Sequence, residues 1–174
     1  MGNVPRHVFL DTSFAEWAYQ DKPFKIACEQ TISQPSTVAF QSTLLDLLPK
    51  QKVLEVGTGS GYQAAVLSLL GGRVFTLERH PKLFSQAKLT LKKLRLNQVL
   101  PEMAPFDRIL VTARASEVPQ VLLNQLKIGG IAVVPVGPEP DKQRMLKITR
   151  ESETEFSSLD QGECAFVPFL KGLG

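Results

Sequence analysis

A glycine-rich turn and two carboxylates form the part of the sequence most clearly suited to binding a ligand. The apolar run from Val53 to Val56 leads through Gly57, Gly59 and Gly61 into a predicted helix. Glycine lets the backbone turn tightly and lets a ligand approach it closely. The spacing differs from that of a dinucleotide-binding turn, whose third glycine comes five residues after the first, whereas Gly61 is four after Gly57.

The acidic residues beside this turn favour a particular kind of ligand. Glu55 would repel a pyrophosphate, but it suits the ammonium group of a cofactor that carries an amino acid. Glu78 ends the next predicted strand, where a carboxylate can accept hydrogen bonds from a ribose diol. A glycine turn without any ligand is the structural alternative, and the two carboxylates together argue against it.

The elements that position these residues alternate between strand and helix from Lys52 onward. This pattern predicts a doubly wound, Rossmann-like α/β fold, with a mostly parallel sheet and an antiparallel strand pair at its C-terminal edge. The predicted strands are 53–56, 73–77, 108–112 and 131–136, with Met145 to Thr149 and Ala165 to Leu170 as the antiparallel pair. The predicted helices are Pro35 to about Leu48, 62–70, 81–96 and 119–126.

Length and composition predict one domain over residues 1–174, with an N-terminal helical cap (1–49), a cofactor-binding core (50–137) and C-terminal strands (138–174). A net charge of +3 from 20 basic and 17 acidic residues argues against nucleic-acid binding. No apolar stretch suggests a membrane segment or signal peptide, so we expect a cytoplasmic protein. Separately, we expect a monomer. We expect no metal site, and we expect Cys28 and Cys164 to be buried, reduced thiols.

The glycine turn and Glu78 together resemble the first two motifs of class I S-adenosylmethionine-dependent methyltransferases. The resemblance implies S-adenosyl-L-methionine as cofactor and S-adenosyl-L-homocysteine as product. It implies that Gly57 and Gly59 pack on the methionine part, that Glu55 holds its amino group, and that Glu78 binds the ribose. The full set of expected cofactor-binding residues is Gln30, Thr31, Ile32, Glu55, Gly57, Thr58, Gly59, Glu78 and Arg79.

Motifs outside the turn resemble one family of these enzymes, the protein-L-isoaspartate O-methyltransferases. They are the segments 4–9 (Val-Pro-Arg-His-Val-Phe), 30–35 (Gln-Thr-Ile-Ser-Gln-Pro), 104–107 with 111–113, 129–130 with 134–137, and 166–168. The resemblance implies methylation of the free carboxylate of L-isoaspartyl residues in damaged proteins and peptides. It implies that Ser33 orients that carboxylate as the catalytic residue, and that the other substrate-binding residues are Val111, Thr112, Ala113, Val167 and Pro168.

This chemistry needs no catalytic base, because a carboxyl group with a pKa near 4 is already ionised at neutral pH. The protein mainly has to align the reacting atoms. Ser33 also has a structural interpretation, since Ser33 or Gln34 could cap the helix that begins at Pro35. One hydroxyl could serve both purposes.

The sequence departs from the family between Asn97 and Met103. The resemblance implies a Gly-Asp-Gly segment here, whose aspartate contacts adenine, and this chain lacks it. Joining the preceding helix directly to the next strand would require a rare left-handed crossover. We therefore predict that the chain is interrupted between Asn97 and Met103.

Two other functions stay open: a methyltransferase acting on RNA or a small molecule, and an inactive methyltransferase-like binding module.

Overall fold

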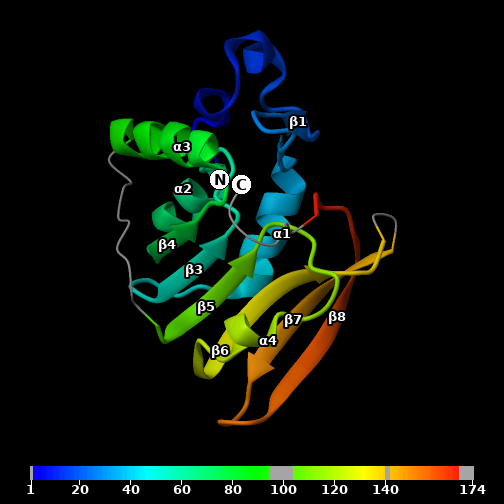
Figure 1. Cartoon of the computed structure of the whole chain (residues 1–174). Helices are drawn as coiled ribbons and strands as arrows, with labels where there is room; N and C mark the ends of the chain where they lie inside the picture. Colours follow the sequence, from blue (N-terminus) through cyan, green and yellow to red (C-terminus); the bar gives the residue numbers. More distant parts are fainter. Residues whose placement is uncertain (1, 95–103, 140–141, 169–174) are drawn as a thin grey trace.

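The computed structural model describes residues 2–94, 104–139 and 142–168. The predicted interruption between Asn97 and Met103 lies outside these described residues. In the described part, a central sheet has six strands in the order β4-β3-β5-β6-β7-β8 (Figure 1). None of the described helices is long and apolar enough to cross a membrane.

The sheet is parallel at one side and antiparallel at the other. Four strands run parallel to one another: β3 (Lys52–Val56), β4 (Arg73–Leu77), β5 (Phe106–Val111) and β6 (Leu126–Val136). They are followed by an antiparallel pair, β7 (Gln143–Arg150) and β8 (Phe156–Cys164). The predicted mixed α/β sheet with an antiparallel C-terminal edge is therefore confirmed.

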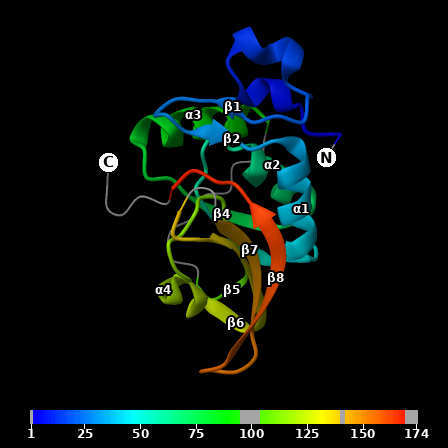
Figure 2. The same cartoon turned by 90° about the vertical axis from the view of Figure 1, so that its right-hand side faces the viewer.

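Helices lie on both faces of the sheet because its central strands are apolar on both sides. The helices are α1 (Pro35–Leu45), α2 (Tyr62–Leu69), α3 (Pro81–Lys93) and the short α4 (Gln120–Leu123). Figure 2 shows α1 on one side of the sheet and α4 on the other. Leu45 and Leu67 pack with Val53 in one core cluster, whereas Leu123 packs with Ile109 in a second. Each such buried side chain contributes roughly 1.5–3 kcal/mol.

The N-terminal segment forms a cap at the end of the sheet where β3 and β4 finish. It contains two 3₁₀ helices, η1 (Arg6–Phe9) and η2 (Thr12–Trp17), and a small antiparallel ladder of β1 (Phe24–Lys25) with β2 (Thr31–Ile32). Figure 1 shows these elements above the ends of the strands. The last residues of this segment lead directly into α1, so the cap and the first helix share one wall of the site.

Several predicted elements were wrong in extent or place; α3, for example, ends at Lys93 and not at 96. Helix α1 ends at Leu45 rather than near Leu48, because Asp46 adopts a left-handed conformation with φ of 48°. Helix α4 has four residues, and β6 starts at Leu126, where we expected helix. The last strand is β8, over 156–164, and not Ala165 to Leu170, of which residues 169 and 170 lie outside the described part.

The error over β8 has a physical cause. β8 is the outer strand of the sheet and most of its side chains are exposed, so it needs few apolar residues. Its polar sequence therefore looks like a loop. The cysteines also differ from expectation, since Cys28 and Cys164 are free but only partly buried.

Candidate active site

The glycine turn after β3 has the backbone geometry that only glycine accepts easily. Gly57, Gly59 and Gly61 all have positive φ angles, of 106°, 52° and 88°. A Cβ atom added to Gly57 would also overlap with the hydroxyl of Thr112 at the end of β5. That hydroxyl donates to the carbonyl oxygen of Gly57 (2.6 Å), and the backbone N–H of Thr112 donates to that of Val56 (3.0 Å). The turn and the end of β5 are therefore fixed against each other.

Glu78 follows β4 and holds the other side of the turn. Its Oε2 accepts a hydrogen bond from the backbone N–H of Gly59 (2.7 Å), and its Oε1 accepts one from the N–H of His80 (2.9 Å). Each carboxylate oxygen can accept more than one hydrogen bond, so acceptor capacity is left for a diol. Glu78 is only partly buried and lines the cavity described below.

Glu55 is completely buried, and it does not line that cavity. Its Oε2 accepts a hydrogen bond from the Thr76 hydroxyl (2.5 Å), and the Thr76 hydroxyl lies 2.6 Å from that of Thr58. Burial raises the pKa of Glu55 to about 8, against the opposing effect of the Thr76 hydrogen bond. The Glu55 carboxyl group therefore does not reach the cavity where we expected it to hold the amino group of the cofactor. It instead supports the back of the glycine turn through Thr76 and Thr58.

Ser33 lies between β2 and α1, where the N-terminal cap meets the core. The N-cap residue of α1 is Gln34, and no side chain makes a capping hydrogen bond there. The structural interpretation of Ser33 as the helix cap is therefore wrong. Its carbonyl oxygen accepts a hydrogen bond from Nη2 of Arg6 (3.0 Å), which fixes the backbone at this position. Among the described residues, none forms a hydrogen bond with the Ser33 hydroxyl.

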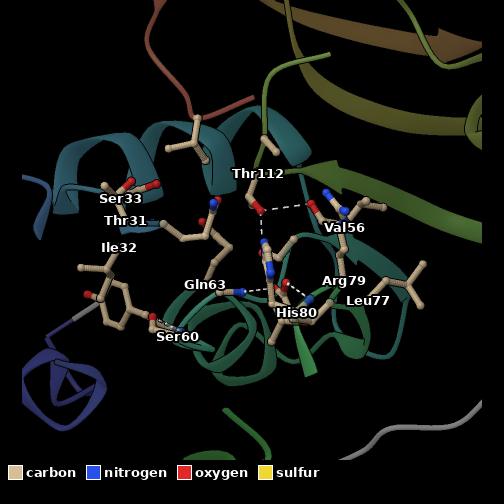
Figure 3. Close-up of a pocket in the computed structure, with 18 of the residues that line it drawn as sticks. Thr31, Ile32, Ser33, Val56, Ser60, Gln63, Leu77, Arg79, His80 and Thr112 are labelled. Carbon is tan, nitrogen blue, oxygen red and sulfur yellow. Dashed lines mark hydrogen bonds between the residues drawn. The ribbon is translucent and has the colours of Figure 1, made fainter. Parts of the chain in front are cut away.

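A cavity of about 480 Å³ brings most of the predicted site residues together (Figure 3). Every predicted site residue lines it except Glu55 and Val111. Val111 is buried in the sheet, and its carbonyl oxygen accepts a hydrogen bond from Gln41 (3.1 Å). The lining also contains residues that the sequence reasoning missed: Val38, Val56, Ser60, Tyr62, Gln63, Leu77 and His80. Of these, Gln63 left a signal, as a polar residue in the first turn of a mostly apolar helix.

A second cavity, of about 470 Å³, adjoins the first. Thr31, Ser33, Thr112 and Val167 line both of them. The outer wall of the second cavity comes from residues 163–167, at and just after the end of β8. The hydrogen bond from Arg114 N–H to the Val167 carbonyl (2.7 Å) ties this segment to the end of β5. The described residues contain no group of three or more His, Cys, Asp or Glu side chains arranged to hold a metal ion.

The mixed sheet, the glycine turn after β3 and the carboxylate after β4 define an α/β methyltransferase of the S-adenosylmethionine-dependent class. A crystal structure from Plasmodium falciparum, titled as a protein-L-isoaspartate O-methyltransferase in complex with S-adenosyl-L-homocysteine, has a similar fold. Its TM-score is 0.84 at 24% identity, covering 97% of this chain and 87% of that one.

The family follows from sequence similarity. The family model described as Protein-L-isoaspartate(D-aspartate) O-methyltransferase matches residues 1–174. The Protein-L-isoaspartate O-methyltransferase of Christiangramia forsetii is 51% identical, covering 98% of this chain and 84% of that protein. The chain belongs to the protein-L-isoaspartate(D-aspartate) O-methyltransferase family.

The relatives carry internal residues that this chain does not. The protein of the same name from Roseobacter denitrificans is 46% identical over 185 aligned positions, which cover all of this chain and 86% of that protein. Because the chain has 174 residues, 11 of the 185 positions have no residue in it. The aligned region of that relative is therefore longer than this chain.

Proposed function

We propose that this protein transfers the methyl group of S-adenosylmethionine to the free carboxylate of L-isoaspartyl residues in damaged proteins and peptides. The observation that carries the proposal is the junction of the two cavities. Ser33 and Thr112 line both, so a ligand in the first cavity and a side chain entering the second would meet beside them. The family membership supports the same substrate class.

The first cavity fits the cofactor. Gly57 and Gly59 bring backbone rather than side chains to its wall, Glu78 presents acceptor capacity for the ribose diol, and residues 30–32 also line it. Arg79 also lines the cavity beside Glu78. When bound, S-adenosylmethionine supplies a methyl group on a sulfonium, which is a good leaving group. The protein's own residues then have to hold the acceptor in line and exclude water.

The second cavity suits an extended peptide. We assign the Ser33 hydroxyl as the donor that orients the isoaspartyl carboxylate, because no described residue engages it. Backbone groups of Thr112–Ala113 and Val167–Pro168 line the passage on the other side and can hold the peptide chain. Because an ionised carboxylate is already nucleophilic, these residues need to position it and do not need to remove a proton.

A methyl-transfer assay with two matched peptides tests the proposal. One peptide carries a single L-isoaspartyl residue, and the other has the same sequence with normal aspartate. We expect labelled methyl to pass to the isoaspartyl peptide and hardly at all to its twin. Equal labelling of both would indicate a different carboxylate substrate. Labelling of neither, by a protein that still binds S-adenosylhomocysteine, would favour the inactive binding module.

A further inference from the structure

We propose that Gln63 binds the amino group of the cofactor's methionine part through its side-chain oxygen. Gln63 stands in the first turn of α2, is almost fully buried, and lines the first cavity. In Figure 3 it lies between Ser33 and Thr112, at the end of the site where the two cavities join. The inference rests on the proposed use of S-adenosylmethionine as cofactor.

Hydrogen bonds fix which way the Gln63 amide points. Its Nε2 donates to the Ser42 hydroxyl on α1 (2.9 Å). That hydroxyl donates its single proton to the carbonyl oxygen of Val38 (2.7 Å). It can therefore only accept a hydrogen bond from Gln63. The Nε2 group must therefore face Ser42, and Oε1 faces away from it.

Gln63 Oε1 has no hydrogen-bond partner, although it is buried. Buried acceptors in proteins nearly always have a partner, so an unpaired one in a cavity wall indicates a missing donor. Within the described residues, only one other buried side-chain acceptor is unpaired, Oε1 of Glu55, and it lies behind the turn. Arg79 Nε is also buried and unpaired in the lining, but it is a donor and follows Glu78 at the ribose end.

Unlike Gln63 Oε1, three backbone acceptors at the glycine turn have a hydrogen-bond donor already. The carbonyl oxygen of Gly57 accepts from the Thr112 hydroxyl, that of Val56 from the Thr112 N–H, and that of Thr58 from the N–H of Gly61. With the ribose at Glu78, the methionine part extends toward Gln63 and Ser33. An ammonium group there carries three donors and can satisfy the amide oxygen.

The test combines a change in the protein with a change in the ligand. The ligands are S-adenosylhomocysteine and its analogue in which hydrogen replaces the amino group, both titrated by calorimetry. We expect the unaltered protein to prefer S-adenosylhomocysteine by about 10- to 100-fold, as for a hydrogen bond to a charged group. Gln63→Leu should lose most of that preference while binding the analogue with nearly unchanged affinity.

Two further variants separate this role from a general packing effect. Gln63→Glu restores an acceptor and should recover the preference, with a stronger dependence on salt. Gln41→Leu removes another buried amide, the one on α1 that donates to the Val111 carbonyl, and should leave the preference unchanged. If Gln63→Leu does not fold, failure of Gln63→Glu to retain the preference contradicts the assignment.

The outcomes distinguish this inference from the proposed function. If Gln63→Leu binds both ligands in the same ratio as the unaltered protein, an ordered water or another group satisfies Oε1, and the assignment of Gln63 is wrong. If the unaltered protein binds neither ligand, the proposed cofactor is wrong, and the assignment of Gln63 fails with it.

Discussion

Replacing the buried Glu55 with glutamine should remove a large pH dependence from the stability of this protein. The pKa of Glu55 is raised from 4.5 to about 8 by burial. Between these two pH values the folded protein holds a proton on Glu55 that the unfolded chain has released. Stability therefore falls as the pH rises through this window, because the folded state binds more protons than the unfolded state.

The size of the effect follows from the shift. Each pKa unit corresponds to about 1.36 kcal/mol, so the penalty grows from zero below pH 4.5 to roughly 5 kcal/mol above about pH 8, as an order of magnitude. Glutamine cannot ionise, and its oxygen can still accept from Thr76. Its NH₂ group would, however, face the side where Glu55 Oε1 has no partner, at a cost of about 1–3 kcal/mol.

Urea unfolding followed by circular dichroism, at intervals from pH 5 to pH 9, measures the difference. We expect Glu55→Gln to be equal to or less stable than the unaltered protein at pH 5, and more stable by a few kcal/mol at pH 9. Glu163→Gln is the matched control, since Glu163 is exposed on β8 and should leave the profile unchanged. Parallel profiles for the unaltered protein and Glu55→Gln would refute the reasoning.

Three further substitutions test the site. Ser33→Ala should lower turnover at least about tenfold yet change the free energy of unfolding by less than about 0.5 kcal/mol, because Ser33 does not cap α1; undiminished turnover would remove Ser33 from the mechanism. Glu78→Ala should weaken S-adenosylhomocysteine binding by about 1–3 kcal/mol in calorimetry, and unchanged affinity would place the ribose elsewhere. Arg6→Met should lower the free energy of unfolding by about 3 kcal/mol in urea titrations, since it leaves backbone carbonyls unpaired; a loss below about 1 kcal/mol would contradict this.

The parallel part of the fold could be predicted because its strands are short apolar runs separated by glycine turns and amphipathic helices. The strand 73–77 was predicted with the bounds that the structure has. The outer strand β8 could not be recognised in the same way, because pairing on one edge stabilises it without a buried face. The end of helix α1 could not be predicted either, because Asp46 adopts its left-handed conformation in the context of the residues that follow the helix.

Site residues could be predicted where the backbone conformation requires a residue type, and less well where a side chain could point to either face of the sheet. The positive φ angle of the turn requires Gly57, and Glu78 is placed by its position directly after β4. Glu55 belongs to a strand whose residues are buried on both faces, so its sequence does not say which face the carboxylate takes. Gln63 is a binding candidate only once Ser42 is known to hold its nitrogen, and that contact joins two residues on different helices that are 21 apart in the sequence.

Arg6, in the N-terminal cap, helps to position the residues where the two cavities meet. Arg6 is fully buried and donates hydrogen bonds to the carbonyl oxygens of Ala18, Lys22 and Ser33. Its guanidinium also lies 5.7 Å from the ring centre of Tyr62, the first residue of α2. One side chain thus holds the backbone that presents the Ser33 hydroxyl against the helix that follows the glycine turn. This contact therefore fixes the distance between Ser33 and the start of α2, on which the alignment of acceptor and cofactor in our proposal depends.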